Sequence, residues 1–422
     1  MKKTALLALL FAGVLFLSSC GGKTNAALSV YLVQTDALYV SALGEYASLY
    51  PERKMDLQTF PTYDEMAERL STELMSGKGP DLLLFNSLQG SIDVQKLATS
   101  NAFLPLDDRM ESLSADDYFV QIFDAGKIDG KQQLLPLSWN ILQSYSKEGT
   151  ASEGLMLDIL AAEAEALASQ SDMALCSLNF ERDDAMNLML EVCGVSLTGE
   201  DGRLSVDEAA FRRAAEATKL YYDQMAQIQA VGQRYRNDFA GAASHVSFLL
   251  ENFSFMNNLR YYQTTYPTLL STEMDFHTFD RLDGGLTAQV VEFAAINRSS
   301  KQADAAWEVL QYLLDAPYSM DFSKYEQANV YYAPVNRKTY ENCITQLATQ
   351  GGQGPKIRLE PLNADNAELL RQLPGRVTEA VIPNPTMGGI LQECLEPYFM
   401  GDKDFESCYA EFQNKAALYL DE

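Results

Sequence analysis

The stretch from residue 28 to residue 85 constrains the fold most, because patterns typical of strands and helices alternate along it. Short apolar or alternating runs are typical of strands, and apolar residues at helical spacing fill the intervals between them. The expected strands are residues 28–33, 55–60 and 82–85, and the expected helices are residues 37–50 and 63–75. This β-α-β-α-β order predicts an α/β fold in which helices cover a parallel sheet. Ligands of such sheets bind at the carboxyl ends of the strands.

The same mixture of elements continues to the end of the chain. We expect further strands at residues 134–137 and 288–296, and further helices at residues 153–168, 207–231, 303–314 and 402–420. Ser205 and Asp207 are both candidate N-cap residues for the helix at 207–231. Trp307 falls on the apolar face of its helix, which predicts a place in the core.

The first twenty residues have the pattern of an export signal. Lys2 and Lys3 precede an apolar run from Thr4 to Leu17 that is too short for an ordinary membrane-spanning helix. The run leads into Leu17-Ser18-Ser19-Cys20, which resembles the lipobox of bacterial lipoproteins. We therefore expect residues 1–19 to be removed and Cys20 to carry a lipid anchor with acyl chains such as palmitate. A non-lipidated signal peptide with an incidental cysteine is the alternative.

An exported chain of this pattern would act outside the cytoplasm. Residues 20–27 are then a short tether, and the remainder is longer than one hydrophobic core usually spans, so two lobes are expected. The formal charge is −26, and removal of Lys2 and Lys3 makes it −26 − 2 = −28. Such a charge repels nucleic acid and favours neutral or cationic ligands.

Several kinds of catalytic or metal site are disfavoured by the residues that would have to build them. The chain has two histidines, His245 and His277, and contains no H-E-x-x-H, P-loop or G-x-S-x-G string. Carboxylate pairs such as Asp107-Asp108 point apart in a strand or loop, so they do not flank one glycosidic bond. We expect no enzyme activity, no metal and no cofactor.

The cysteines beyond Cys20 are odd in number and lack C-x-x-C spacing, which argues against a disulfide framework and a zinc site. Small buried thiols are the main expectation, and one or two bridges are the alternative in an exported protein. The residues concerned are Cys176, Cys193, Cys343, Cys394 and Cys408.

Several short strings occur in an order that is similar to the extracellular solute-binding lipoproteins of bacterial ABC importers, in the group typified by oligosaccharide binders. The similarity follows nearly all of the chain after Cys20. Besides the lipobox, the strings are Gly79-Pro80-Asp81-Leu82 before a strand ending in Asn86-Ser87, Phe103 to Asp107, Asp129-Gly130-Lys131 before Leu135-Pro136, Ala305-Ala306-Trp307, Ala333-Pro334-Val335-Asn336 and Gln413-Asn414-Lys415.

This resemblance implies a two-lobed periplasmic-binding-protein-like fold, with each lobe a mostly parallel sheet flanked by helices and the ligand in the cleft between them. It implies a first lobe of residues 28–137 plus 287–325 and a second lobe of residues 138–286 plus 326–422. It also implies a monomeric protein that captures a sugar and delivers it to the membrane subunits of an ABC permease. The Tyr145-Ser146-Lys147 string departs from the pattern, because many members have a Tyr-Asn pair there.

A sugar presents hydroxyls and an apolar C–H face, so its binders combine aromatic rings with planar polar groups. Trp139 beside Asn140, at an expected lobe crossing, is the leading candidate for a stacking platform, and a place in the hinge core is the alternative. Asn86 and Ser87 follow an expected parallel strand, and Asp36 lies at the same edge after the first strand. A simple turn role is the alternative for these polar residues.

Three further candidates complete the expected site. Phe253 could present a ring to the ligand, although burial in the core is the competing expectation for its segment. Gly285 would let the backbone approach a ligand or swing as a hinge. Tyr331 precedes the loop near an expected third crossing. The alternative functions are binding of a peptide, polyamine or organophosphate on the same fold, a secreted polysaccharide hydrolase, and a surface adhesion protein.

Overall fold

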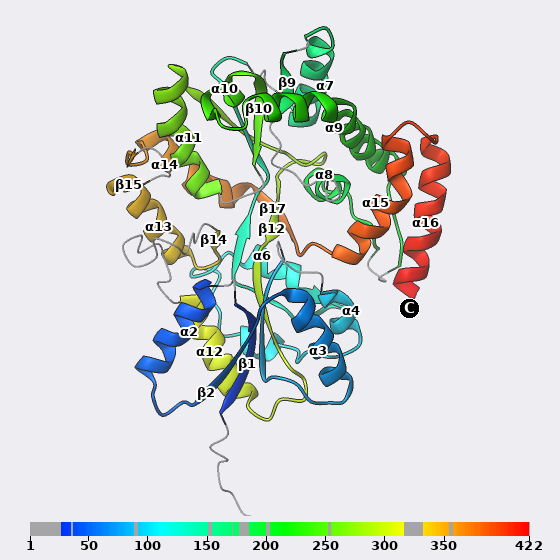
Figure 1. Cartoon of the computed structure of the whole chain (residues 1–422). Helices are drawn as coiled ribbons and strands as arrows, with labels where there is room; N and C mark the ends of the chain where they lie inside the picture. Colours follow the sequence, from blue (N-terminus) through cyan, green and yellow to red (C-terminus); the bar gives the residue numbers. More distant parts are fainter. Residues whose placement is uncertain are drawn as a thin grey trace, which may run out of the picture.

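The computed structural model describes residues 27–34, 37–87, 92–150, 154–170, 172–176, 185–199, 203–251, 255–315, 332–353 and 358–421. These residues form two α/β lobes, one above the other in Figure 1, with strands running between them. Within this part of the chain, no helix combines the length and the apolar character needed to span a membrane.

The first lobe is built on a sheet with the strand order β2-β1-β3-β13-β6. Strands β1 to β3 are parallel, as the sequence predicts, whereas β13 pairs antiparallel with both β3 and β6. The strands are β1 (Leu28–Val33), β2 (Met55–Phe60), β3 (Leu82–Asn86), β13 (Glu292–Ile296) and β6 (Leu135–Pro136).

Helices cover this first sheet, and α2, α3 and α12 lie where the sequence predicts them, whereas α4 was not predicted. Thr62 begins α3, because its side chain accepts a hydrogen bond from the Glu65 backbone N–H at 3.3 Å. Helix α12 buries Trp307, so the expected core position of this ring is confirmed. The helices are α2 (Ala37–Leu49), α3 (Tyr63–Met75), α4 (Val94–Thr99) and α12 (Ala303–Asp315).

A connecting segment lies between the first-lobe helices and the hinge. It consists of short pieces: α5 (Asp107–Met110), α6 (Val120–Phe123), the 3₁₀ turn η1 (Asp124–Gly126), β4 (Lys127–Ile128) and β5 (Lys131–Gln132). Gly126 is required here because a Cβ would lie 1.9 Å from the Leu134 carbonyl oxygen. The close approach seats this segment against the strand that leads out of the lobe.

The second lobe contains two mixed sheets, with strand orders β14-β7-β12-β17 and β11-β8-β10-β9. In each sheet one pair is parallel, β12 with β17 and β10 with β9, and the other pairs are antiparallel. The expectation of mostly parallel sheets is therefore corrected for this lobe. The strands are β14 (Ala333–Pro334), β7 (Ser138–Asn140), β12 (Leu286–Val290), β17 (Val377–Val381), β11 (Met274–Thr278), β8 (Gln143–Lys147), β10 (Val246–Glu251) and β9 (Ala174–Cys176).

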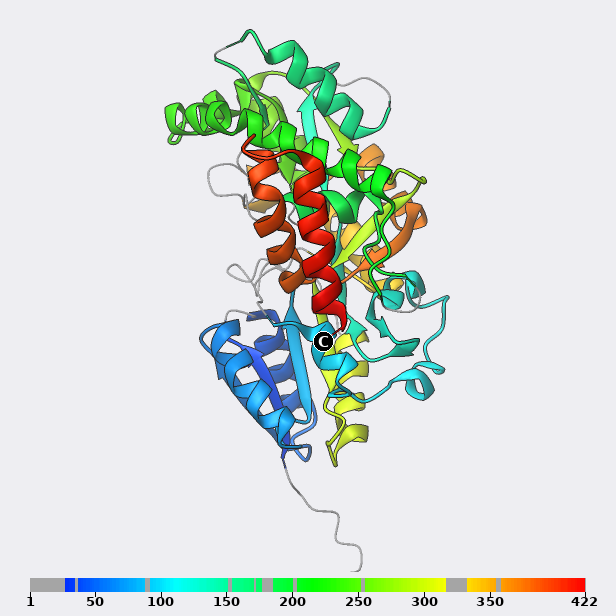
Figure 2. The same ribbon diagram turned by 90° about the vertical axis from the view of Figure 1, so that its right-hand side faces the viewer.

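Helices surround the second-lobe sheets, and the last two run side by side toward the first lobe (Figure 2). Stacking of Phe211 on Phe412, with ring centroids 5.1 Å apart, holds the last helix against α9. The helices are α7 (Met156–Leu167), α8 (Ala185–Cys193), α9 (Glu208–Arg234), α10 (Phe239–Ser244), α11 (Phe255–Leu270), α13 (Arg337–Thr349), α14 (Ala364–Arg376), α15 (Pro385–Phe399) and α16 (Phe405–Asp421). A small hairpin joins β15 (Gly352–Gln353) to β16 (Arg358–Leu359).

The chain passes between the lobes at Leu137 and again at Val291. The expected single strand at 288–296 is two strands, since β12 pairs with β7 and β13 pairs with β3. The two crossings are hydrogen-bonded to each other, with Leu137 N donating to Glu292 O at 2.8 Å and Val291 N donating to Ser138 O at 3.0 Å. By its pairing, β12 groups with the second lobe, whereas the proposed boundary at residue 287 places most of it in the first.

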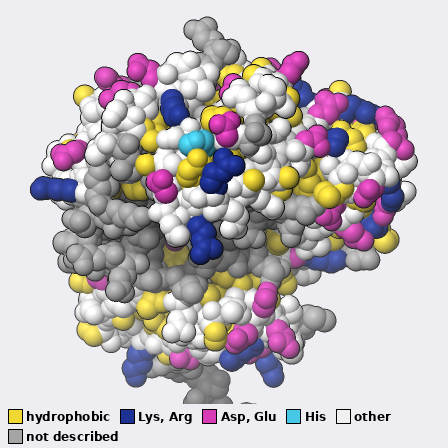
Figure 3. All heavy atoms as spheres, turned by 45° about the horizontal axis from the view of Figure 1, so that its top comes forward, with side chains coloured by type: hydrophobic (Ala, Val, Ile, Leu, Met, Phe, Trp, Pro, Cys, Tyr) yellow, Lys and Arg dark blue, Asp and Glu magenta, His cyan; other side chains and the backbone are white. Residues whose placement is uncertain are grey.

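The cysteines outside the N-terminal region are free and buried. Burial raises the pKa of the Cys176 thiol to about 12, so this side chain is a neutral member of the core at physiological pH. On the face shown in Figure 3, acidic and basic side chains of the described residues are interspersed, with acidic groups dense at the right-hand edge of the second lobe. Among these residues, the basic side chains form no broad patch of the kind that binds nucleic acid.

Candidate functional site

The carboxyl ends of β1, β2 and β3 meet at the edge of the first sheet that faces the second lobe. Gln34 N donates to Phe60 O at 2.7 Å, which ties the end of β1 to the end of β2. Gln34 is exposed, and Asn86 at the end of β3 is 5% exposed. Parallel strands therefore bring polar side chains from separate parts of the chain to one edge, as the fold rule requires.

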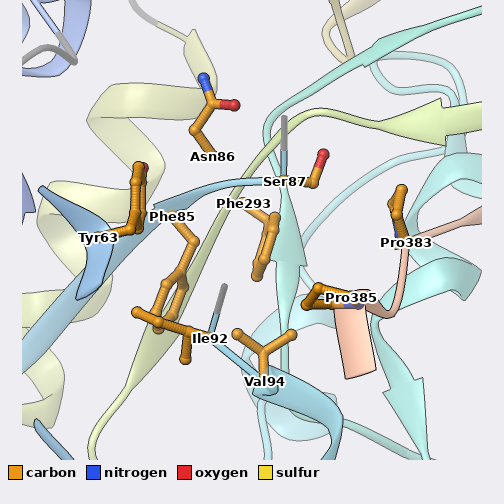
Figure 4. Close-up of a pocket in the computed structure, with 9 residues that line it drawn as sticks. All are labelled: Tyr63, Phe85, Asn86, Ser87, Ile92, Val94, Phe293, Pro383 and Pro385. Carbon is orange, nitrogen blue, oxygen red and sulfur yellow. The ribbon is translucent and has the colours of Figure 1, made fainter. Parts of the chain in front are cut away.

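A small pocket opens at this edge, and Figure 4 shows the residues around it. Phe85 and Phe293 stack with ring centroids 5.2 Å apart and form its floor. Its free volume is about 20 Å³, which is room for roughly one water molecule. Pro383 and Pro385, at the start of α15 in the second lobe, line one side. The lining residues are Tyr63, Phe85, Asn86, Ser87, Ile92, Val94, Phe293, Pro383 and Pro385.

Ser87 connects this edge directly to the second crossing of the chain. Its hydroxyl donates to Val290 O at 2.8 Å, and its backbone N–H donates to Val291 O at 2.8 Å. The adjacent Glu292 carboxylate is buried and accepts a hydrogen bond from the Ser138 hydroxyl at 2.8 Å. Ser87 of the candidate site is therefore hydrogen-bonded to residues at which the chain changes lobe.

Trp139 lies on β7 within an aromatic cluster and has no exposed surface. Its ring centroid lies 5.1 Å from that of Phe255, 6.1 Å from that of Tyr340 and 6.2 Å from that of Phe119. In this arrangement a sugar could stack on the indole only if one of these rings moved. Within the described part of the chain, the indole N–H has no hydrogen-bond partner.

Asn140, the next residue on β7, is 1% exposed and holds the start of α11. Its side-chain oxygen accepts a hydrogen bond from the Phe255 backbone N–H at 3.2 Å. This contact places Phe255 beside Trp139. It also brings the beginning of α11 close to β7, just after the chain crosses into the second lobe at Leu137. Asn140, Trp139 and the Ser87–Val290 contact are thus close neighbours through the pairing of Trp139 with Val290.

The other expected site residues are placed differently or fall outside the description. Gly285 lies at the start of β12, at the opposite end of that strand from the Ser87 contact. Its φ is +80°, and a Cβ there would lie 2.4 Å from the Thr378 hydroxyl oxygen, so glycine is needed for close packing against β17. Cys20, Asp36, Phe253 and Tyr331 lie outside the described residues.

Sequence reasoning missed Tyr63, whose ring borders the pocket in Figure 4 and is 4% exposed. It is the first residue of α3, directly after β2 and the Thr62 N-cap. The signal that could have found it is its position, because the loop after a parallel strand lies at the ligand-binding edge.

The Ser146 hydroxyl and His277 Nε2 are hydrogen-bonded at 2.8 Å, which is a Ser–His pair within the described part of the chain. Ser146 has no exposed surface, so a substrate cannot reach its hydroxyl in this arrangement. Burial lowers the pKa of His277, with Asp275 acting in the opposite direction. Across the described ranges, no group of three or more His, Cys, Asp or Glu side chains could hold a metal ion.

A larger cavity of about 330 Å³ also lies between the lobes, beside η1, α8, β17 and the start of α15. Its walls carry both amides and charged groups. Glu191 accepts hydrogen bonds from Asn187 at 2.7 Å and from Gln289 at 2.6 Å, and Lys127 pairs with Asp124 at 2.6 Å. The lobes are therefore not packed against each other throughout their junction.

Most of the chain is similar in structure to solved sugar-binding and ABC substrate-binding proteins. The sugar-binding protein MalE from Xanthomonas citri aligns with a TM-score of 0.66 and 15% identity, over 94% of this chain and 98% of that one. The GacH receptor of Streptomyces glaucescens, solved unliganded and with acarbose, aligns with a TM-score of 0.62 and 13% identity, over 94% and 99%. An ABC substrate-binding protein from Listeria monocytogenes in complex with cycloalternan gives 0.61 and 14%, over 94% and 99%.

No protein-family model and no curated protein matches the sequence. At these identities the structural likeness establishes the fold, which is the two-lobed periplasmic-binding-protein-like fold.

Proposed function

We propose that this protein is an extracytoplasmic solute-binding protein that captures a sugar or oligosaccharide between its lobes and delivers it to the membrane subunits of an ABC permease. The observation that carries the proposal is the position of the candidate site, at the shared edge of β1 to β3, where the residue after β3 contacts a lobe crossing. Proteins that share this fold over 94% of the chain include a sugar-binding protein and a receptor that binds acarbose.

The residues at this edge suit a hydroxyl-rich ligand. Asn86 and Ser87 offer an amide and a hydroxyl, and Gln34 offers a second amide, while Tyr63 supplies an aromatic ring. Trp139 and Asn140 stay proposed as ligand residues, with Trp139 requiring a rearrangement of its cluster. Asp36, Phe253, Tyr331 and Gly285 also stay proposals on their position in the sequence.

Capture requires that the ligand bind one arrangement of the lobes more tightly than the other, because equal affinity for both would shift nothing. The hydrogen bonds of Ser87 to Val290 and Val291 give the site a direct connection to the hinge. A ligand group that competes for the Ser87 hydroxyl would therefore alter a hinge contact as it binds.

The net charge of −26 favours one alternative ligand class on the same fold, namely polyamines and other cations. A thermal-shift panel of oligosaccharides, polyamines and peptides separates the two. A ligand at a hundredfold excess over its Kd raises the free energy of unfolding by about 2.7 kcal/mol. We expect a carbohydrate to raise the melting temperature and to be recovered unchanged after incubation. Stabilisation by polyamines alone, or turnover of the carbohydrate, would refute the sugar-binding proposal.

We also propose that Cys20 anchors the mature protein to the membrane surface by lipid. Cys20→Ala should abolish incorporation of labelled fatty acid, since it removes the thiol that carries the diacylglycerol. The measurement is metabolic labelling followed by immunoprecipitation, with Ser19→Ala as a control that retains the thiol and a small residue before it. Labelling that persists in Cys20→Ala would show that the anchor is elsewhere.

A further inference from the structure

Helix α4 of the first lobe and helix α16 of the second lobe contact each other beside the hinge. The C-terminal end of α16 lies next to α4 in Figure 1. The Tyr419 hydroxyl donates a hydrogen bond to the Asp93 carboxylate at the start of α4. The Lys96 ammonium lies 5.3 Å from the centroid of the same tyrosine ring. One side chain of the last helix is therefore held by two residues of the other lobe.

A second pair of contacts lies next to this one. The Asn384 side-chain amide donates to Gln95 Oε1 of α4 and, at 3.0 Å, to the Tyr419 hydroxyl oxygen. Gln95 Nε2 in turn donates to Ile382 O at 3.2 Å. Together these bonds link α4 to both the start of α15 and the end of α16. We name Asp93, Gln95, Asn384 and Tyr419 the interlobe latch.

Two members of the interlobe latch are also helix N-caps, and each divides its side chain between the two tasks. Asp93 Oδ1 accepts from Lys96 N at 2.9 Å to cap α4, while Oδ2 accepts from Tyr419. Asn384 Oδ1 accepts from Met387 N at 3.0 Å to cap α15, while Nδ2 faces α4. Because the caps fix these side chains, the groups that cross between lobes are oriented in advance.

Backbone restriction and burial add to this orientation. Asn384 lies between Pro383 and Pro385, whose rings fix φ and limit the conformation of the residue before each. Burial, followed by the hydrogen bond to Asp93, raises the pKa of Tyr419 to about 12, so its hydroxyl keeps its proton at neutral pH. The donor of the central bond is therefore present under physiological conditions.

The surroundings show why these few bonds matter. Gln95 and Asn384 both line the cavity of about 330 Å³ between the lobes. Where a cavity separates two surfaces, their side chains do not pack, and dispersion contacts across the gap are lost. The interlobe latch therefore bridges a part of the junction that packing does not hold.

We propose that the interlobe latch restrains rotation of the lobes, holding them in the arrangement described here until its hydrogen bonds break. The inference depends on the two-lobed fold and its contacts, and not on which ligand the protein binds. The net contribution of each hydrogen bond of this kind changes the equilibrium constant between the two lobe arrangements by about fivefold. Loss of the Tyr419 hydroxyl and the Gln95 amide should thus raise the population of separated lobes by more than tenfold.

Pulsed electron paramagnetic resonance on the ligand-free full chain tests this proposal. Spin labels carried by non-canonical amino acids replace Glu68 on α3 and Asn414 on α16, which are exposed and lie on different lobes. Tyr419→Phe keeps the ring and removes only the hydroxyl, and Gln95→Ala keeps a good helix former in α4. We expect the single variants to broaden the distance distribution toward longer separations and the double variant to broaden it further.

Tyr409→Phe is the matched control. It removes a tyrosine hydroxyl from the same helix, and that hydroxyl is not part of the interlobe latch. It should leave the interlobe distances unchanged. Distances that are unchanged in Tyr419→Phe, or that change equally in Tyr409→Phe, would overturn the proposal. If the double variant does not fold, the single Tyr419→Phe variant, checked by thermal unfolding, still decides the question.

Discussion

The packing of the Trp139 ring depends on residues from other parts of the sequence, because the rings around it belong to Phe119, Phe255 and Tyr340. We expect Trp139→Ala to lower the free energy of unfolding by about 3–5 kcal/mol through the cavity it creates. Trp139→Phe should lose less, because it retains part of the packed volume. Urea denaturation of both variants measures these differences.

Ligand affinity measured on the same variants separates packing from stacking on a sugar. A destabilised Trp139→Ala protein that binds normally when folded would show that Trp139 only packs in the hinge core. A variant of nearly wild-type stability that no longer binds would contradict the predicted loss of stability and favour the platform.

Tyr31 gives the first lobe a dependence on alkaline pH. Burial and a 2.8 Å hydrogen bond to Glu73 raise the pKa of Tyr31 from 10.0 to about 12, although nearby Arg69 acts in the opposite direction. The folded state thus keeps this proton to higher pH than the unfolded state. The resulting stability is complete below pH 10 and is lost as the pH rises through about 12.

We therefore expect the free energy of unfolding to fall less steeply with pH in Tyr31→Phe than in the wild type over this interval. Denaturation at a series of pH values measures the slope, and other buried tyrosines contribute equally to both proteins. Identical slopes would show that Tyr31 titrates at the same pH in the folded and unfolded chains.

At the scale of elements, local signals predict six of the helices, namely α2, α3, α7, α9, α12 and α16, whereas α8, α11, α13, α14 and α15 were not predicted. Ser205 and Asp207 were both candidate caps for the helix at 207–231, and the structure selects Asp207, which accepts from Ala209 N at 2.9 Å and Ala210 N at 3.2 Å. Asp207→Ala should cost about 1 kcal/mol, because it leaves these two N–H groups without their acceptor.

Ser205→Ala is the neighbouring control, since Ser205 is exposed and lies outside the helix. Thermal unfolding compares the two variants. Equal melting temperatures for Asp207→Ala and wild type would mean that water replaces the cap without loss.

The strands of the second lobe were harder to predict, for two physical reasons. The sequence QSYSK of β8 has no apolar alternation, yet Gln143, Ser144 and Ser146 are fully buried because the sheet satisfies their backbone groups on both sides. The apolar run at 288–296 continues through Val291, so only pairing with two different partners reveals the break. The local sequence pattern therefore indicates neither the burial of β8 nor the break between β12 and β13.

At the scale of the whole molecule, the pattern at 28–85 predicted the parallel strands whose edge carries the candidate site, and the resemblance predicted two lobes. The candidate site could be predicted only in part. Asn86 and Ser87 follow from strand position, whereas the contact of Ser87 with Val290 joins residues 203 positions apart. This contact depends on how the crossing segments pack against each other. The residues that neighbour Ser87 in the sequence do not reveal that packing.

Strand β13 lies between β3 and β6 in the first sheet, although it follows them by most of the second lobe in the chain. During synthesis, β3 and β6 therefore emerge long before the strand that joins them, and the first sheet stays incomplete until residue 296 is available. Pairing over such sequence distances is slow because the intervening loop must close first. The nascent chain accordingly lacks a finished first lobe for most of its synthesis, a state that would suit the export that we propose.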